Sequence, residues 1–320
     1  MKKTLFMWLL TIVTAQVASA QTNATGSVKD EKGNPLHFVF VGDSQYKNAA
    51  YSDSLGNFTI AVHPDSKLQL ELAGYQNASI DAGKNSAGLQ VVLIPLGSAN
   101  SNSTVSTKST SSDLTEFERP TDAGLADLPG HKKGNVHGNR YLFDDFVHGF
   151  IITASGALVH NPDYLFDYDK MAGPLLLTQN KTSITEVGWD RIKSFTLYSN
   201  SDERFDFEKV PAIDNSHYVQ VLASGSKYKV YKLIKTKFIK SDYVNTGMTS
   251  HGNDYDEYAD DADYYVLEVQ GNQLKKLSLK KKSIKEDFAK DADKVNKYLS
   301  DNSANIDDVY LSKLGAFMNQ

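Results

Sequence analysis

The densest group of potential ligand atoms is an acidic run in the last third of the chain. Residues 254–263 contain five aspartates and one glutamate. Such oxygen clusters suit calcium, but a loop of the EF-hand type needs an oxygen ligand where Tyr258 falls and a glycine where Ala259 falls. We therefore expect a solvated acidic loop. The alternative is a calcium site made by Asp254, Asp256, Glu257, Asp260, Asp261 and Asp263.

Two groups of lysines flank this acidic run in the sequence. Opposite charges drawn together relieve like-charge repulsion, so the lysines either pair with the acidic run or form a solvated strand face. We find no RNA- or DNA-binding signature beside them, and nucleic acid is not an expected partner. The first group is Lys227, Lys229, Lys232, Lys235, Lys237 and Lys240, and the second is Lys275, Lys276, Lys280, Lys281, Lys282 and Lys285.

Catalytic motifs are missing from the sequence. There is no Gly-x-Ser-x-Gly elbow, no His-Glu-x-x-His pair and no glycine-rich nucleotide loop. His131 and His137 offer too few ligands for a metal, which favours a solvated loop. His148 and His160 flank a hairpin signal at Ser155-Gly156; a tight turn there places Ile151 opposite His160, which indicates ordinary sheet histidines.

Carboxylates and aromatic residues crowd the segment from Tyr141 to Asp169. The aspartates could do acid–base work, although aspartate is also common in turns. The aromatic side chains favour a buried core, and a minority at the surface would instead form a sugar-stacking patch. The aspartates are Asp144, Asp145, Asp163, Asp167 and Asp169, and the rings are Tyr141, Phe143, Phe146, Phe150, Tyr164, Phe166 and Tyr168.

The first twenty residues have the order of an export signal. Lys2 and Lys3 precede an apolar run from Leu5 to Val13, and Ala18-Ser19-Ala20 follows. This pattern predicts a signal peptide over residues 1–20 that is cleaved before Gln21. No later segment has the roughly 20 apolar residues that spanning a bilayer requires, so we expect no transmembrane segment.

Composition narrows the compartment and the partners. The chain has no cysteine, which excludes disulfides and favours a bacterial periplasm or cell surface for an exported protein of 320 residues. The formal net charge is -5. That balance gives no reason to expect nucleic acid or an anionic membrane as partner. We expect a protein that is periplasmic, outer-membrane-associated or secreted.

Turn signals and a composition shift divide the mature chain. Residues 21–96 read as short strands separated by turns, which suggests a small β-sandwich. Residues 97–137 are rich in Ser, Thr, Asn, Gly and Asp and predict a disordered linker. Residues 138–320 predict a second β-rich domain, sandwich or barrel-like, that ends in two helices. The fold class is therefore mainly β.

The N-terminal segment resembles a known family. It resembles the carboxypeptidase regulatory-like domain, a transthyretin-like β-sandwich of exported Bacteroidetes proteins. The markers of that family occur here in three blocks and in the same order. The resemblance covers residues 25–95 and implies a generally non-catalytic module. The markers are Gly26, Val28, Asp30, Gly33, Pro35, Leu36 and Val39, then Asp53, Gly56, Phe58 and Ile60, then Gly74-Tyr75.

The C-terminal part changes from strand to helix periodicity. A turn at Gly271-Asn272 would place Glu268 opposite Lys275 and Val266 opposite Leu277. Beyond it, Ser283 to Glu286 has the pattern of a capping box for a helix over about 284–299. Asn305 is the expected cap of a second helix over about 306–317. The two apolar stripes predict a helical hairpin on the sheet, or a partner-recruiting tail. The stripes are Ile284, Phe288, Val295 and Leu299, then Ile306, Val309, Tyr310, Leu314 and Phe317.

These patterns favour a non-catalytic binding, adaptor or scaffold protein of the cell envelope. The second domain would carry specificity, and the first would act as a spacer or docking module. An envelope protein or a surface glycan is the expected partner. The alternatives are a hydrolase that acts on a peptide or glycan through carboxylates of the second domain, and a purely structural envelope component.

Overall fold

The computed structural model describes residues 22–43, 48–63, 66–82, 86–97, 114–120 and 135–320. The predicted signal peptide lies outside the described residues. The fold is mainly β, as the sequence predicts, with helices near the C-terminus. Within the described ranges, no helix is both long enough and apolar enough to cross a bilayer.

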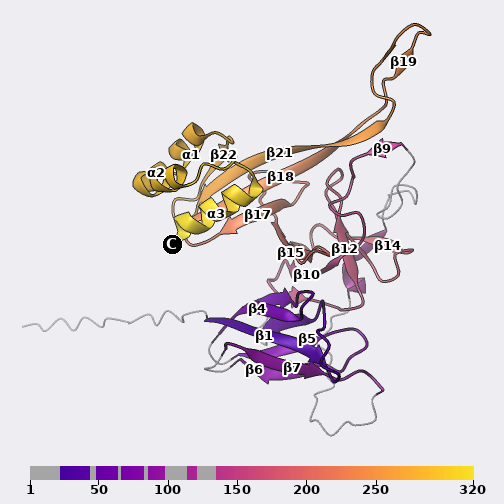
Figure 1. The fold of residues 1–320 in the computed structure, drawn as a ribbon, viewed down its shortest axis with the longest axis vertical. Coiled ribbons are helices and arrows are strands. Elements are labelled where there is room, and N and C mark those ends of the chain that lie inside the picture. The colour runs from indigo at the N-terminus through magenta and orange to yellow at the C-terminus, as the bar shows by residue number, and fades with distance from the viewer. Residues whose placement is uncertain (1–21, 44–47, 64–65, 83–85, 98–113, 121–134) are drawn as a thin grey trace, which may run out of the picture.

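The N-terminal domain consists of two small sheets packed face to face (Figure 1). One sheet has the order β4-β1-β7 and the other β3-β2-β5-β6. Alternate residues of β4 are buried, as expected for a strand with one face in a core. The strands are β1 (Thr22–Asp30), β2 (Phe40–Asp43), β3 (Ala49–Tyr51), β4 (Asn57–Val62), β5 (Lys67–Glu71), β6 (Ala78–Asp81) and β7 (Leu89–Leu93).

Two aspartates fix the turns of this domain. The Oδ1 atom of Asp30 accepts hydrogen bonds from the amides of Lys32 (2.9 Å) and Asn34 (2.8 Å). Asp53 bonds the amide of Asn57 in the same way at 2.7 Å. Such Asx turns explain why aspartate stands at these two marker positions. Gly56 has φ +79°, and a Cβ there would lie 2.4 Å from the carbonyl oxygen of Val28.

The second domain is built on one long sheet and one small sheet. The long sheet has the order β11-β10-β15-β16-β17-β18-β21-β22, and β9 pairs with β21. The small sheet has the order β12-β13-β14-β8, and its inner side chains pack on β10 and β15. The long-sheet strands are β9 (Val136–His137), β10 (His148–Thr153), β11 (Leu158–Val159), β15 (Ile192–Tyr198), β16 (Arg204–Glu208), β17 (Val219–Ser224), β18 (Tyr228–Ile239), β21 (Asp256–Glu268) and β22 (Gln273–Leu277). The small-sheet strands are β8 (Glu118–Pro120), β12 (Leu165–Tyr168), β13 (Leu175–Thr178) and β14 (Ile184–Val187).

The aromatic residues of 141–168 supply much of this core, as expected. Tyr168 and Phe166 are fully buried, and Tyr168 packs against Phe195 and Phe207 at ring-centroid distances of 5.7 and 5.1 Å. Phe143 is only partly buried, yet it contacts Phe205 rather than open solvent. The core interpretation of these rings is confirmed.

The predicted linker contains part of the second domain. Residues 114–120 form the short helix η1 (Thr115–Phe117) and strand β8, and the side chains of Leu114 and Phe117 are buried in the core. The sequence did not predict a structured segment here, because only two of its side chains, Leu114 and Phe117, are large and apolar. Residues 98–113 and 121–134, including His131, lie outside the described residues.

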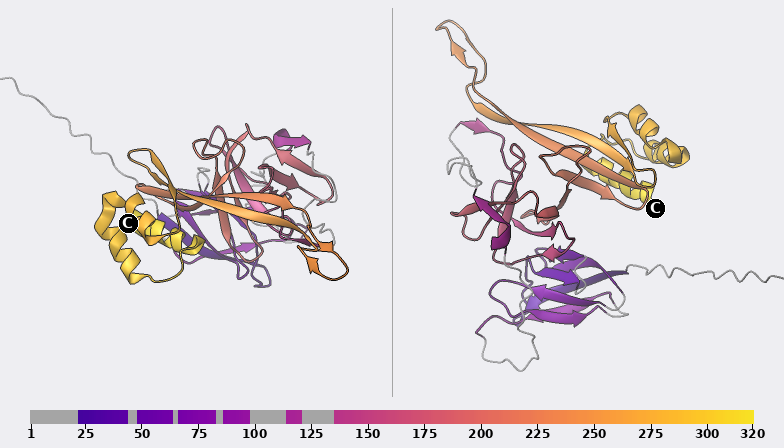
Figure 2. Two further views of the ribbon diagram at one scale, coloured as in Figure 1. Left: turned by 90° about the horizontal axis from the view of Figure 1, so that it is seen from above. Right: turned by 180° about the vertical axis from the view of Figure 1, so that it is seen from behind.

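Strands β18 and β21 form a long hairpin that continues beyond the neighbouring strands as an arm (Figures 1 and 2). At its end, β19 (Val244–Asn245) and β20 (Ser250–His251) form a two-stranded tip. We call residues 235–261 the arm. Its tip exposes the apolar side chains of Val244 (47%) and Met248 (94%).

The C-terminal helices pack on β17, β18 and β22, so the predicted docking of an apolar stripe on the sheet is confirmed. Val309 is the exception, since its side chain is 60% exposed. The first predicted helix is interrupted at Phe288 by a short 3-10 turn. The elements are α1 (Lys281–Asp287), η3 (Ala289–Asp291), α2 (Ala292–Asp301) and α3 (Asp308–Asn319).

Both predicted helix caps are wrong. Helix α1 begins before Ser283, whose hydroxyl instead bonds the carboxylate of Asp287 at 3.0 Å. Helix α3 is capped by Asp307, which accepts from the amide of Tyr310 at 2.8 Å. Aspartate and asparagine are both good N-cap residues. Because the buried stripe of α3 begins at Tyr310, the helix starts after Asp307 rather than after Asn305.

Both predicted hairpin registers are also wrong. Ile151 pairs with Val159, because the first loop has three residues with Gly156 at φ +85°. Val266 pairs with Lys275, because four residues, Val269–Asn272, form the second loop. Loop length sets register, and neither loop is the tight two-residue turn that the sequence suggested.

Asn319 joins the last helix to the β17–β18 turn. Its Oδ1 accepts from the amides of Lys227 (3.0 Å) and Tyr228 (2.9 Å), while its Nδ2 donates to the carbonyls of Tyr228 (2.9 Å) and Gly315 (2.8 Å). All four polar bonds of this side chain are therefore made to backbone.

We expect Leu314→Ala to destabilise the second domain by about 3 kcal/mol, because it leaves a cavity in a fully buried apolar cluster. Val309→Ala on the same helix is the matched control and should change the unfolding free energy by less than about 0.5 kcal/mol. Chemical denaturation of both variants measures the difference. Equal effects would mean that α3 does not pack as described.

Candidate ligand cleft between the domains

An aromatic cluster holds the two domains together. Phe40 and Tyr51 of the N-terminal domain are buried against Phe150 and Tyr198 of the second domain. The Tyr51 ring meets Tyr198 edge-on at 5.1 Å, and its hydroxyl donates to the carbonyl of Gly149 at 2.9 Å. Offset and edge-on aromatic pairs add binding energy beyond area burial.

Histidines line the same interface. The His160 ring stacks on Phe40 at 3.6 Å, and its Nδ1 lies 3.1 Å from the Tyr51 hydroxyl. His148 packs against Phe38 at 4.5 Å. Burial lowers the pKa of His148 to about 4 and that of His160 to about 3. Both rings are therefore neutral at pH 7, as sheet histidines in an apolar setting should be.

Polar contacts rim the interface. Asp202 lies in the β15–β16 turn and accepts from the Ser54 hydroxyl at 3.0 Å, and its Oδ1 is 2.6 Å from His37 Nε2. Arg204 Nη1 donates to the carbonyl of Ala49 at 3.1 Å. These contacts fix how the domains sit against each other.

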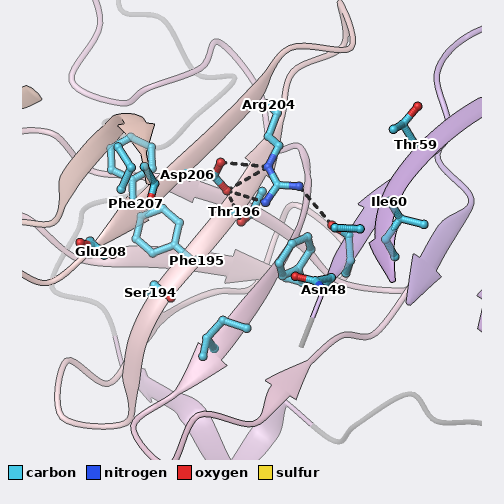
Figure 3. A pocket seen from close by; sticks show the side chains of 16 residues that line it. Asn48, Thr59, Ile60, Ser194, Phe195, Thr196, Arg204, Asp206, Phe207 and Glu208 are labelled. Carbon is cyan, nitrogen blue, oxygen red and sulfur yellow. Dashed lines mark hydrogen bonds and ion pairs between the residues drawn. The ribbon is translucent and has the colours of Figure 1, made fainter. Parts of the chain in front are cut away.

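A cleft of about 390 Å³ opens beside this interface (Figure 3). Its floor is the face of the long sheet that carries Ser194, Thr196, Asp206 and Glu208, and residues 59–61 of β4 form the opposite wall. The pairs Ser194↔Glu208 and Thr196↔Asp206 are in register, so their side chains share one face. The remaining lining residues are Asn48, Ala49, Phe150, Ile152, Phe195, Arg204, Phe207, Val221 and Ser224.

Each carboxylate of the cleft has a cationic partner. Arg204 Nε donates to both Asp206 oxygens at 3.0 and 2.9 Å, and the Thr196 hydroxyl donates to Asp206 at 2.7 Å. Burial lowers the pKa of Arg204, but hydrogen bonds and the charge of Asp206 outweigh it and leave the pKa above its ordinary value. The guanidinium is permanently charged.

Glu208 is held in a similar way. Its carboxylate accepts from Lys229 Nζ at 3.0 Å and from the Tyr231 hydroxyl. Burial and the neighbouring Glu208 raise the pKa of Tyr231, so its hydroxyl stays a donor. The cleft is thus neutral overall and preorganised by its own ion pairs.

The acidic run is not a loop. Residues 256–268 form β21, in which successive side chains point to opposite faces, and Asp254 lies before the strand. This arrangement spreads the other five candidate ligands along an extended strand. In the portion of the chain that the structure describes, no three His, Asp or Glu side chains are grouped to hold a metal ion.

The lysine groups lie beside the acidic run, but most of their ion pairs are with other carboxylates. In the register Lys235 is opposite Asp261, yet its Nζ bonds Asp214 at 2.6 Å. Lys276 pairs with Asp263 at 2.6 Å. Lys232 pairs with Asp308. The acidic Asp260 binds Lys170 instead, with Nζ–Oδ2 at 2.7 Å. The expected pairing of the lysines with the acidic run is therefore confirmed for Lys276 and Asp263, whereas Lys232 and Lys235 have acidic partners outside the run.

The other sequence candidates lie apart from the cleft. Asp169 bonds Arg140 Nε at 2.9 Å, and Asp145 pairs with Lys181. Burial raises the pKa of Asp167, although the amides of Tyr168 and Phe143 bond its carboxylate. Asp144 lies near Asn139, and Asp163 is in an exposed turn. His137 stacks on Tyr255 at 3.7 Å.

Sequence reasoning missed Arg204, Asp206 and Glu208. A signal was present: Arg204 to Glu208 alternates charged residues with phenylalanines, which predicts a strand with one buried and one polar face. What the sequence could not show is that the N-terminal domain lies over that polar face.

Comparisons with known proteins give no family. Neither the protein-family models nor the curated proteins contain a match to this chain. Among solved structures, a 9R-lipoxygenase from Cyanothece PCC8801 matches at 11% identity and a TM-score of 0.18, over 62% of this chain and 43% of that chain. A similarity at that level carries no argument about fold or function.

We expect acid to destabilise the protein through the interface histidines. The pKa of His148 is lowered in the folded state, so the unfolded chain takes up a proton first as the pH falls. The stability that neutral His148 contributes is fully present above about pH 6.5, the pKa of histidine in the unfolded chain. It is lost progressively as the pH falls to about 4, the pKa in the folded protein. The loss for this group is on the order of a few kcal/mol.

Thermal melts between pH 4 and 8 measure this effect. His148→Phe keeps a ring against Phe38 and should make the pH dependence shallower, with the contribution of His160 remaining. His251→Phe changes an exposed histidine of the arm and should keep the wild-type profile. A His148→Phe profile as steep as that of wild type would rule out this source of acid sensitivity.

Proposed function

We propose that this chain is a non-catalytic binding protein of the cell envelope, and that the interdomain cleft holds a neutral, hydroxyl-rich ligand such as a surface glycan. The observation that carries the proposal is the pairing of charges in the cleft. Arg204 neutralises Asp206 and Lys229 neutralises Glu208. A charged ligand would have to displace one of these partners.

Hydroxyl groups suit such a lining. A sugar hydroxyl can donate to the Asp206 and Glu208 carboxylates and can also exchange hydrogen bonds with Ser194. Ile152 and Val221 add apolar surface beside these groups. The volume of about 390 Å³ lies within the range of small-ligand pockets, which begins at roughly 300 Å³.

Export supports a surface glycan as the ligand class. The pattern of residues 1–20 predicts delivery outside the cytoplasm, where glycans are abundant. The resemblance of residues 25–95 to the carboxypeptidase regulatory-like domain supports a non-catalytic role for the first domain. In the cleft, this domain supplies one wall, so it contributes to binding as well as spacing.

A hydrolase is the second candidate, and one observation favours it. Asp206 and Glu208 lie two residues apart on one face of β16 and both line the cleft. Against this, each carboxylate is already engaged by a cationic side chain, Asp206 by Arg204 and Glu208 by Lys229, and would have to leave that partner to act on a substrate. The binding function is therefore better supported.

We expect calorimetric titration against a panel of neutral bacterial oligosaccharides to find a ligand. Glu208→Gln should weaken ligand binding about tenfold, because a ligand hydroxyl would lose its charge-assisted hydrogen bond to the Glu208 carboxylate. Glu203→Gln is the control, since Glu203 is exposed in the β15–β16 turn and does not line the cleft.

Product analysis of the same mixtures separates the two candidates. An intact oligosaccharide after prolonged incubation supports binding, and Glu208-dependent cleavage supports the hydrolase. Equal binding by both variants would place the ligand outside the cleft and contradict the proposal.

A further inference from the structure

Strand β4 is an edge strand that borders the cleft. Its sheet has the order β4-β1-β7, and among the described residues only β1 pairs with β4. Residues 59–61 of β4 line the cleft together with Asn48 and Ala49, which lie at the edge strand β3 of the other sheet of this domain. The cleft therefore meets the N-terminal domain where two strand edges lie side by side (Figure 3).

The backbone groups of Thr59 and Ala61 face away from β1. The amide of Val28 in β1 donates to the carbonyl of Gly56 at 2.8 Å, so the backbone groups of Gly56 face β1. Successive residues of an antiparallel strand direct these groups to alternate edges. Because Thr59 and Ala61 lie an odd number of positions beyond Gly56, their amides and carbonyls face the free edge.

Only these two residues of β4 keep unbonded groups on the free edge. The amide of Asn57 donates to Asp53 Oδ1 at 2.7 Å, and its carbonyl accepts from the Asp53 amide at 2.8 Å. The carbonyl of His63, just beyond β4, is bonded within the following turn at 3.1 Å. In the described part of the chain, the outward amides and carbonyls of Thr59 and Ala61 have no hydrogen-bond partner.

The wall and the floor of the cleft offer different hydrogen-bonding groups. The N-terminal wall supplies the amides of Thr59 and Ala61, and also Asn48 Nδ2, which is buried without a hydrogen-bond partner among the described residues. The floor supplies the carboxylates of Asp206 and Glu208. A carboxylate has lone pairs for more than one donor, so its cationic partner does not exhaust it. Amide donors on one side thus accompany anionic acceptors on the other.

We propose that the ligand of the cleft carries acetamido groups, as N-acetylated amino sugars do, and that the free edge of β4 recognises them. A secondary amide is planar and trans, so its C=O and its N–H point in opposite directions. The acetamido carbonyl accepts from the outward amide of Thr59 or Ala61, and its N–H is then directed toward the carboxylates of the floor. A neutral sugar without this group makes only the hydroxyl contacts.

This inference rests on the proposed glycan-binding function and narrows it to one class of sugar. A peptide is the other ligand that a strand edge accepts, and it gains its affinity from a row of main-chain hydrogen bonds. Here the row is short, because the backbone groups on either side of Thr59 and Ala61 are bonded within turns. A short edge favours a single amide group over an added strand.

Calorimetric titration of the full chain with chitotriose and cellotriose tests the acetamido contact. These two neutral trisaccharides have the same linkage, and they differ only in an acetamido or a hydroxyl group on each sugar. Chitotriose should bind at least about tenfold more tightly, because it adds hydrogen bonds on both sides of the cleft. Trialanine with blocked ends carries amides without sugar rings and should bind at least about tenfold more weakly than chitotriose.

The outcomes distinguish this inference from the glycan proposal. Equal binding of chitotriose and cellotriose would overturn the inference and leave the glycan proposal in place. Binding of trialanine as tight as that of chitotriose would also overturn it, in favour of a peptide ligand. If no neutral oligosaccharide of the panel binds, both proposals fail.

Proline variants test the edge itself. Thr59→Pro and Ala61→Pro each remove one outward amide, and an edge strand tolerates proline where the amide faces away from the sheet. At least one of them should reduce the preference for chitotriose over cellotriose to below about threefold. Val92→Pro changes an exposed residue of β7, the opposite edge of the same sheet, and is the matched control that should keep the preference.

Hydrogen exchange on the wild-type chain gives a measurement that needs no variant. Exchange at the amide of Thr59 or Ala61 should slow about tenfold with saturating chitotriose and much less with saturating cellotriose, with the melting temperature as the check on folding of the proline variants. Unchanged exchange at both amides would contradict the inference. So would a preference that survives in both β4 variants, or one that Val92→Pro abolishes equally.

Discussion

The Arg204 guanidinium is the contact on which the arrangement of the two domains depends. Three of its bonds stay within the second domain, to Asp206 and to the Tyr198 hydroxyl, and one reaches the carbonyl of Ala49 in the other domain. The planar fork of donors lets one side chain do both. Without it, Asp206 would keep only the Thr196 hydroxyl as partner and would have no cation beside it, and the cleft would lose both its neutrality and its fixed wall.

The interface separates two tasks. The aromatic cluster of Phe40, Tyr51 and Phe150 supplies buried apolar surface, and the polar rim sets the orientation. His148 and His160 pack with the aromatic cluster as neutral rings, because burial lowers the pKa of both. The aromatic cluster and the polar rim thus bring the two walls of the cleft together without a ligand.

Local patterns predicted the elements better than their connections. The alternation of Phe58, Ile60 and Val62 identified β4, and the apolar stripe from Ile284 to Leu299 identified a helical region. Registers and caps failed because they depend on loop length and on where a buried stripe begins. The cleft could not be predicted at all, because its walls come from segments about 150 residues apart, and no local rule reports such contacts.

The acidic run shows how composition can mislead. Six carboxylates in ten residues suggest a loop, because like charges repel and prefer water. The strand forms nevertheless, since Tyr264–Glu268 pair with Tyr228–Lys232 of β18 and the same register continues through the acidic half. Lys170 and Lys276 then offset part of the repulsion from the body of the domain.

The bonds of Asn319 have a consequence for how the second domain folds. One amide side chain satisfies backbone groups of the turn between two central strands, so that turn and the last helix complete each other. The hairpin of β17 and β18 lacks these partners until the final helical turn has docked. The sheet centre and the C-terminal helix should therefore form in a single cooperative step, with neither able to melt before the other.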